Sequence, residues 1–358
     1  MKIMFYISTI CNGGAARVMS NLANMLSERG HDCTLITTFR TLEEYHLAEG
    51  VKRISFYDQK PTGAWLTKNV AITRMLRRQV KQKQPDLLVS FLAEPNFRAA
   101  IATIGLKTKT IVSVRNDPNR EYRGLLPRLL AKYLFRRVDG IVFQTADAKQ
   151  WFPVSIQRKG RIIFNAVKEE FYNITLGSKP TGIVATGRLN VQKNHPMLIR
   201  AYSKIANKVT DDLIIYGAGD PSELMSLSVD LGVANRVHIP GQTMNVAGAL
   251  KNAKVYVMSS DFEGMPNALM EAMAMGLPCI STDCPCGGPR SLFTKEMYHF
   301  LTKVGDADEM SKRLLELINN PDIRIVHGLH CKQAASSFRP SIINSQWENY
   351  LKEIIASE

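Results

Sequence analysis

Apolar residues in the first half of the chain form short continuous runs, which alternate with longer stretches where apolar positions recur every three or four residues. The first run, 2–9, is rich in Ile and aromatic residues, and similar runs follow at 33–38, 86–91, 110–114 and 139–144. Runs without polar alternation are typical of strands buried on both faces of a parallel sheet. Helical spacing predicts helices over 18–29, 68–83 and 120–139.

The second half of the chain repeats this alternation. Strand-like runs lie at 182–186, 212–216, 237–239, 253–258 and 278–282. Helical patterns lie at 196–206, 222–231, 246–251, 266–275, from 307 onward, and at 338–355. Such alternation predicts two doubly wound α/β domains. Periodicity is lost over 168–180, which we interpret as a linker, so we expect domains at 1–168 and 169–337 and a C-terminal helix at 338–358.

One loop and helix, 261–278, combine several signals. Pro266 suits the first helical turn, Gly276 suits a left-handed stop, and Pro278 prevents continuation. The N-terminus of a helix presents free N–H groups and a positive dipole end, which favour a phosphate. Glu263 and Glu271 bracket that end, and carboxylates accept hydrogen bonds from sugar hydroxyls. Taken alone, this pattern is equally compatible with an ordinary buried βα unit carrying two surface acids.

A second loop with candidate chemistry follows the strand pattern 182–186. It begins at Gly187 and places Arg188 and Lys193 five residues apart before the next helix. Two such cations can close on a diphosphate, because Arg offers a planar fork of donors and Lys a point charge. Two solvated charges on a surface loop would show the same spacing. The spacing alone therefore does not distinguish a diphosphate site from an ordinary loop.

These motifs together resemble those of the family-four retaining glycosyltransferases. The resemblance rests on Glu263 and Glu271 with Gly-Met-Pro between them, on Gly187-Arg188-Leu189 followed by Lys193, and on the loop at 12–18. It covers essentially the whole chain and is closer in the second half. It implies the GT-B fold, in which two Rossmann-like domains face each other across a cleft and a C-terminal helix crosses back to the first domain. The first domain would then bind the acceptor and the second the nucleotide-sugar donor.

The resemblance also implies roles for individual residues. In this family the two cations hold the donor diphosphate, the first Glu holds the transferred sugar and the second Glu holds the ribose. The implied catalytic residues are Arg188, Lys193 and Glu263. The implied donor-binding residues are Gly14, Gly187, Gly217, Gly241, Gly264, Met265, Pro266, Asn267 and Glu271. The implied acceptor-side residues are Asn12, Gly13, Arg17, Arg115, Asn116 and Asp117.

The loop at 115–117 departs from the family pattern. Many members carry a His near this point, beside the transferred sugar, whereas this chain has Arg115, Asn116 and Asp117. The loop follows a strand of an open α/β sheet, where ligands gather, so these residues remain candidate contacts. A structural turn at Asp117-Pro118 is the alternative interpretation.

Charge is distributed unevenly along the chain. Residues 1–170 hold 28 Lys and Arg against 14 Asp and Glu, whereas residues 171–358 hold 18 of each, so the first half carries the whole net charge of +14. Such asymmetry indicates an anionic partner for that half, either nucleic acid or an anionic membrane. No zinc finger, RNA-binding aromatic signature or helix-turn-helix supports nucleic acid.

The stretch 120–139 is the membrane candidate within that half. Its leucines alternate with cations, and a basic amphipathic helix can lie in a bilayer interface. The candidate headgroup contacts are Arg128, Lys132, Arg136 and Arg137. The alternative is an ordinary surface helix that buries its Leu face in the core. The two interpretations are compatible if the leucines face the core while the arginines face lipid headgroups.

The cysteines and the distribution of apolar residues bear on membrane insertion, metal binding and cellular compartment. No run approaches the roughly 20 apolar residues of a membrane span, and the first strand pattern is too short for a signal-peptide core. Cys279, Cys284 and Cys286 lack a zinc-site spacing, so we expect no metal and no other cofactor. We expect reduced thiols and a cytoplasmic protein associated peripherally with the inner membrane.

The sequence is best interpreted as a retaining, metal-independent glycosyltransferase that uses a UDP-sugar. It would transfer a hexose or N-acetylhexosamine to a lipid-linked saccharide on polyprenyl diphosphate, in bacterial lipopolysaccharide, O-antigen or capsule synthesis. The alternatives are a nucleotide-sugar hydrolase or epimerase-like enzyme on the same fold, and a basic nucleic-acid-binding protein. The sequence does not specify the transferred sugar, the acceptor linkage or the oligomeric state.

Overall fold

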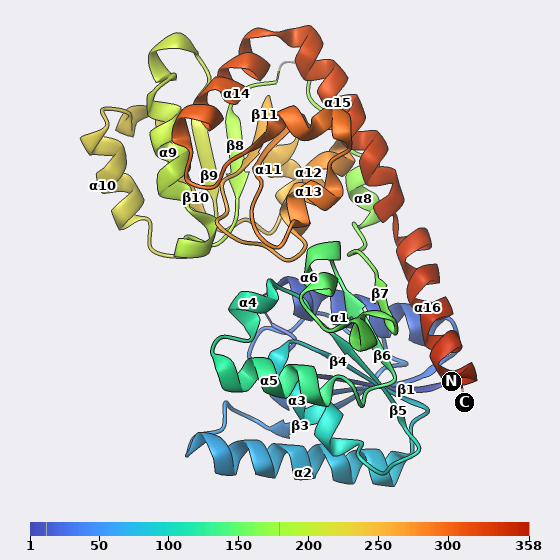
Figure 1. The fold of residues 1–358 in the computed structure, drawn as a ribbon. Coiled ribbons are helices and arrows are strands. Elements are labelled where there is room, and N and C mark those ends of the chain that lie inside the picture. Colours follow the sequence, from blue (N-terminus) through green and yellow to red (C-terminus); the bar gives the residue numbers. More distant parts are fainter. Residues whose placement is uncertain (12, 179, 358) are drawn as a thin grey trace. The chain divides into compact units, whose positions relative to one another are not determined.

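The structure, a computed structural model, describes residues 1–11, 13–178 and 180–357 (Figure 1). It divides into two compact units. The first contains Met1–Asn165 together with Ser341–Glu358, and the second contains Ala166–Pro340. Each unit is built on its own parallel sheet covered by helices. The two parallel-sheet, Rossmann-like domains expected from the alternating pattern are therefore confirmed.

The first unit holds, within its described residues, a seven-stranded sheet of order β3-β2-β1-β4-β5-β6-β7. All neighbouring strands run parallel. Their bounds are β1 Lys2–Ile7, β2 Asp32–Phe39, β3 Lys52–Tyr57, β4 Leu87–Phe91, β5 Lys109–Ser113, β6 Gly140–Phe143 and β7 Gly160–Ile162. The central strands are almost continuously buried, as their apolar sequences require. The order reverses beside β1, so the loops after β1 and β4 diverge at the carboxyl edge, the usual position of a ligand site.

Helices cover both faces of this sheet. They are α1 Gly14–Glu28, α2 Trp65–Lys83, α3 Ala93–Ala102, α4 Pro118–Glu121, α5 Leu125–Leu134, α6 Ala146–Gln150, α7 Val154–Gln157 and α16 Pro340–Ala356. The core on one face joins Tyr6 and Leu88 of the sheet to Leu76 of α2 and Ala99 of α3. Helix α3 in turn packs against α5, so α2, α3 and α5 form one layer (Figure 1).

Helix α16 is the last helix of the chain, yet it belongs to the first unit. Trp347 is buried against Phe91 of β4, with 5.8 Å between ring centroids. The Tyr350 hydroxyl accepts from the Ile141 amide at 2.9 Å and donates to the Lys159 carbonyl at 2.6 Å. These contacts secure α16 to the sheet at β4, at β6 and at the residue before β7.

The second unit holds, among the residues described, a six-stranded parallel sheet of order β10-β9-β8-β11-β12-β13. Its strands are β8 Ile183–Thr186, β9 Leu213–Tyr216, β10 Val237–Gly241, β11 Val255–Met258, β12 Cys279–Thr282 and β13 Leu301–Thr302. Its helices are α8 Glu169–Tyr172, α9 His195–Ser203, α10 Ser222–Asp230, α11 Val246–Leu250, α12 Asn267–Met275, α13 Gly288–Leu292, α14 Ala307–Asn319 and α15 Pro321–Ala335. The order reverses beside β8, which places the loops after β8 and β11 at the switch point.

The helix expected over 120–139 is wrong in extent. The segment forms α4 and α5, separated at Gly124, whose φ of 88° no ordinary helical residue adopts. Arg136 and Arg137 follow the end of α5 in a turn. No helix in the described parts of the chain is both long enough and apolar enough to cross a bilayer.

Candidate active site

The candidate site of the second unit is built on loops at the carboxyl ends of β8, β9 and β10. The Gly187 amide donates to Tyr216 O at 2.9 Å, and the Gly217 amide donates to Gly241 O at 2.9 Å. A Cβ on Gly217 would lie 1.8 Å from the Gly187 carbonyl oxygen. Gly217 is therefore required for the close approach of two loops, and its amide is already engaged.

The loop after β8 delivers Lys193 to Glu263. A single 3₁₀ turn, Val191–Lys193, ends beside α9, and Lys193 Nζ lies 2.5 Å from Glu263 Oε1. The Ser260 hydroxyl donates to the same carboxylate oxygen at 2.9 Å. The structure thus brings together two of the three expected catalytic residues as an ion pair, rather than as independent contacts.

Further bonds join this loop to the one after β11. The Ser259 hydroxyl donates to Lys193 O at 2.8 Å, and Asn194 Nδ2 donates to Asp261 Oδ1 at 2.6 Å. Gln192 Nε2 donates to Phe262 O at 3.0 Å. The ion pair therefore sits on a framework of side-chain and backbone hydrogen bonds, which fixes the separation of the two loops.

Helix α12 begins directly after these residues. Pro266 is its N-cap residue and supplies no side-chain cap, while Gly276 ends the helix in the left-handed conformation with φ 83°. A Cβ on Gly288 would lie 2.0 Å from Gly264 O, so α13 can approach the loop before α12 only with glycine there. The N-terminus of α12 thus lies between the Glu263 loop and α13.

Glu271 is buried on α12, and Met265 is buried in the preceding loop. Glu271 and Glu263 both act on Tyr256 of β11. Burial raises the pKa of Tyr256, a hydrogen bond with Thr186 opposes the shift, and the negative charges of the two carboxylates add to it. Tyr256, Thr186 and Ser260 are residues that sequence reasoning missed. The sequence signal for Thr186 and Ser260 was their position at the carboxyl ends of β8 and β11, whereas Tyr256 lies within the apolar run of β11.

Arg188 is placed differently from Lys193. Its side chain is exposed, and in the described part of the chain it makes no hydrogen bond or ion pair. Gly241 has φ 88° and open space around it. His195, at the start of α9, is buried, and burial lowers its pKa to about 4, so its imidazole is neutral at pH 7.

The candidate residues of the first unit lie at the carboxyl ends of β1 and β5. Gly13 is the N-cap residue of α1 with φ 155°, and Gly14 begins that helix. Arg17 follows in the first turn, where its amide donates to Gly13 O at 3.1 Å. Asn12 lies outside the described residues.

All three residues of the 115–117 loop have structural partners. Arg115 is buried, its guanidinium bonds Asn165 Oδ1, and it lies 4.6 Å from the centroid of the Phe91 ring. The Asp117 carboxylate accepts from the Asn119 amide at 2.9 Å and so caps α4. Asn116 Oδ1 accepts from the Asp117 amide at 2.8 Å.

Beneath this loop lies Glu121, which sequence reasoning missed. Its carboxyl oxygens are fully buried, and burial raises its pKa to about 7. Backbone N–H groups of Asn116, Arg115 and Ala93 oppose that shift, as does the Arg115 charge. Burial also lowers the pKa of Arg115 to about 9. A buried acid at the carboxyl edge of the sheet thus supports the candidate acceptor loop.

The membrane candidates cluster around Trp151 and Tyr133. Arg128 and Lys132 lie 5.8 and 5.1 Å from the Trp151 ring centroid. Arg137 donates to the Tyr133 hydroxyl at 2.8 Å, and Arg136 is exposed. Leu125, Leu126 and Leu129 are also exposed, so the structure does not support the alternative of an ordinary surface helix with its Leu face in the core. Only Ala131 and Leu134 of α5 are buried.

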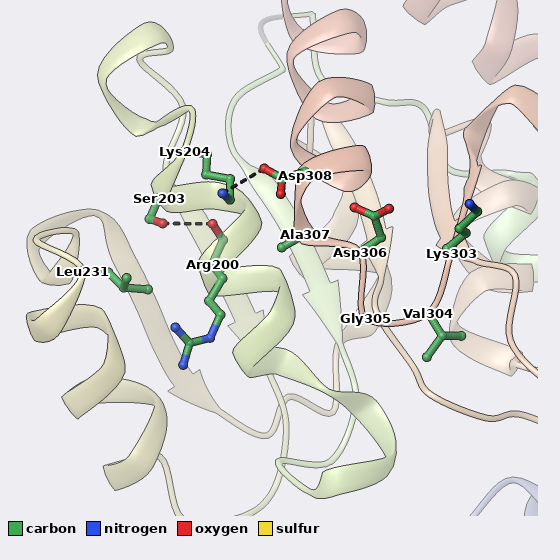
Figure 2. A pocket seen from close by; sticks show the side chains of 10 residues that line it. All are labelled: Arg200, Ser203, Lys204, Leu231, Lys303, Val304, Gly305, Asp306, Ala307 and Asp308. Carbon is green, nitrogen blue, oxygen red and sulfur yellow. Dashed lines mark hydrogen bonds and ion pairs between the residues drawn. The ribbon is translucent and has the colours of Figure 1, made fainter.

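A pocket of about 640 Å³ also lies in the second unit, between the end of α9 and the loop before α14 (Figure 2). Lys204 pairs there with Asp308 at 2.8 Å. The residues that line it include none of the residues singled out from the sequence. In the described ranges, no group of three or more His, Cys, Asp and Glu side chains is arranged to hold a metal ion.

The chain is similar to known glycosyltransferases along nearly its whole length. Residues 180–320 match glycosyl transferases group 1, and residues 12–171 match glycosyltransferase family 4. A Haemophilus influenzae protein described as an uncharacterised glycosyltransferase is 28% identical, over 98% of this chain and 99% of its own. A Campylobacter jejuni N-acetylgalactosaminyltransferase, named for a GalNAc-containing acceptor on diphospho-undecaprenol, is 25% identical over 99% of both chains.

Solved structures show the same fold. The crystal structure of Anabaena HepE in complex with UDP aligns with a TM-score of 0.83 and 18% identity, over 99% of this chain and 100% of its own. The two matched family regions coincide closely with the two parallel-sheet units described above. The chain therefore belongs to the family-four glycosyltransferases with the GT-B fold.

Proposed function

We propose that this glycosyltransferase moves a hexose or N-acetylhexosamine from a UDP-sugar to a lipid-linked saccharide, with retention of anomeric configuration and without a metal ion. The observation that carries the proposal is the gathering of Lys193, Glu263 and Glu271 around the N-terminus of α12. That cluster offers a cation and a helix dipole for a diphosphate, and carboxylates for sugar hydroxyls.

In the proposed reaction the bond between the anomeric carbon and the diphosphate oxygen breaks, and negative charge grows on the leaving group. Lys193, Arg188 and the amides near Pro266 and Asn267 stabilise that charge. Loss of one such preorganised contact typically costs about 2.7–4 kcal/mol of transition-state stabilisation. The acceptor oxygen bonds to the same carbon, and its proton passes to the departing phosphate. No separate protein base is then required.

The Lys193–Glu263 pair gives each partner a second role. An ammonium group has three donors, and one of them is used on Glu263 in the structure. The remaining donors can reach a phosphate while Glu263 uses its second oxygen on the sugar. Glu271 then holds the ribose from inside the first turns of α12, and the backbone at Gly187, Gly217, Gly241, Gly264 and Met265 shapes the donor site.

The choice of UDP and of a lipid-linked acceptor draws support from the relatives. HepE was crystallised with UDP, and the Campylobacter enzyme is named for an undecaprenyl-diphosphate acceptor. The basic first unit suits such an acceptor, with Gly13, Arg17 and the 115–117 loop on its side of the reaction. Arg128, Lys132, Arg136 and Arg137 would face anionic headgroups at the cytoplasmic side of the inner membrane.

The donor site is tested by thermal shift with UDP, GDP, ADP, CMP and a panel of UDP-sugars. We expect stabilisation by UDP and its sugars, and a much smaller shift for Glu271→Gln. The matched control is Glu223→Gln, at an exposed glutamate in the first turn of α10, which should respond like wild type. Equal responses of the Glu271 variant and wild type would place the donor elsewhere.

The reaction itself is tested by product analysis. The anomeric configuration of the product, read by NMR, should match that of the donor sugar, and activity should survive chelation of divalent cations. Inversion, or release of free sugar without transfer to any lipid-linked acceptor, would overturn the proposed chemistry.

A further inference from the structure

An apolar pocket of about 370 Å³ opens on the first unit, between α2, α3 and α5. Its walls include Trp65, Leu66 and Val70 of α2, Phe97 and Ile101 of α3, and Leu130 of α5. The pocket lies in the layer formed by α2, α3 and α5, and its walls include no residue of the donor cluster or of the 115–117 loop. Nothing in the chemistry proposed above uses it.

The rim of the pocket is apolar and exposed. Trp65 and Leu66, in the first turn of α2, are 63% and 65% exposed. On α5, Leu125, Leu126 and Leu129 are 74%, 75% and 55% exposed. Leu126 lies one helical turn before the wall residue Leu130, so the α5 leucines continue the pocket lining outward. Clustered large apolar side chains on a surface mark an interaction site rather than the scattered exposure of an ordinary protein.

The charged side chains of the two helices that flank this face are all cationic. Helix α2 carries six cations and α5 carries two, and neither helix contains an Asp or Glu. The carboxylate that lines the pocket, Glu94, is paired with Arg98 at 2.6 Å. Arg77 donates to Ala102 O and Ile104 O at 2.8 Å each, which holds its guanidinium at the rim.

We propose that this face, hereafter the α2–α5 face, docks on an anionic phospholipid bilayer, and that its pocket receives one hydrocarbon chain from that bilayer. This inference rests on the proposed lipid-linked acceptor, which places the enzyme's work at a membrane. A Trp and leucines ringed by cations match the chemistry of the bilayer interface, where aromatic rings sit at headgroup level. A second copy of this chain fits poorly, because two like-charged faces would repel each other.

The face differs from the docking surface expected from the sequence. Arg136 and Arg137 follow α5, whereas the α2 residues at 65–70 contribute the apolar part that the sequence pattern did not reveal. The cations are attracted to an anionic leaflet, and the apolar rim adds a contribution that salt does not screen. Binding should therefore be only partly reversed by salt.

The test is flotation of the full chain with vesicles of phosphatidylcholine, with and without phosphatidylglycerol. Wild type should float with the anionic vesicles, and Trp65→Gln/Leu66→Gln should bind them about tenfold or more weakly. Met225→Gln/Val229→Gln on α10, also an exposed apolar pair, is the matched control and should bind like wild type. Equal binding by the two double variants would overturn the docking face.

Occupation of the pocket needs its own measurement. Thr73→Trp, which fills the pocket from α2, should weaken vesicle binding, and lipids brominated along their chains should quench Trp65 in wild type. Unchanged binding by the filled variant together with no quenching would overturn the chain-binding pocket. A dimer in sedimentation that Trp65→Gln/Leu66→Gln dissociates, without vesicle binding by wild type, would assign the face to self-association instead.

The UDP thermal shift separates this inference from the proposed function. The α2–α5 variants should keep the full UDP response, because their substitutions lie in the other unit from the donor cluster. If wild type is stabilised by UDP but binds no vesicle, the proposed docking face is wrong and the proposed donor site is retained. A wild type that binds vesicles but no nucleotide overturns the donor site instead.

Discussion

Glu121 shows how burial at a single residue couples stability to pH. Its pKa rises from an ordinary value of 4.5 to about 7, with burial as the main cause. Between these two values the unfolded chain releases the proton while the folded chain keeps it. The free energy of unfolding must therefore fall as pH rises from about 4.5 to about 7, and level off above that.

Replacing this acid with its neutral isostere removes the effect. Glu121→Gln should flatten the pH dependence, gaining up to about 3 kcal/mol relative to wild type between pH 5 and pH 8. Urea unfolding followed by tryptophan fluorescence at several pH values measures this difference. Glu28→Gln, at an exposed glutamate on α1, controls for the loss of a charge. A gap between Glu121→Gln and wild type that does not grow with pH would contradict the assignment.

At the scale of elements, two loops meet because Gly217 lacks a side chain. The Gly217→Ala variant would press its Cβ on the Gly187 carbonyl, 1.8 Å away, and displace the loop that carries Lys193. We expect the UDP thermal shift to fall sharply. Gly232→Ala is the control, because its φ of 69° costs about 1–2 kcal/mol for alanine but no neighbour lies within 4 Å. If both variants keep the UDP response, the close approach does not position Lys193.

The elements that the sequence predicted share a local cause. Helix α12 was bounded correctly because Pro266 and Gly276 act within their own turns, and the buried strands were recognised from uninterrupted apolar runs. Strand β3 was missed because it lies at the sheet edge, where partial burial leaves no continuous apolar run. Helix α15 was missed because apolar residues are spread around it rather than gathered on one face.

The sequence motifs identified residues of the candidate site, but they did not predict which of these residues contact each other. The motifs named Lys193 and Glu263, yet their ion pair joins positions seventy residues apart and depends on loops that only the fold brings together. The exposure of Leu125, Leu126 and Leu129 was likewise hidden, because helical spacing alone does not tell which face meets a core. Long-range packing, not local propensity, supplied both findings.

At the scale of the whole molecule, tryptophan fluorescence can distinguish the unfolding of the two units. The three tryptophans, Trp65, Trp151 and Trp347, all lie in the first unit. Tryptophan fluorescence therefore follows the unfolding of that unit alone, whereas far-ultraviolet circular dichroism follows both. The last helix of the chain provides a way to separate them, because α16 packs on the first unit through Trp347 and Tyr350.

Trp347→Ala should weaken the first unit and spare the second. Removing a buried tryptophan typically costs about 3–5 kcal/mol, so the fluorescence transition should move to markedly lower urea, reported by Trp65 and Trp151. The circular dichroism transition should become biphasic, with its later phase still shifted upward by UDP, because the donor cluster lies in the second unit. Ile355→Ala, at a half-exposed position on the same helix, should leave both transitions nearly unchanged. A single transition that moves together in both signals would show instead that the two units unfold as one cooperative body.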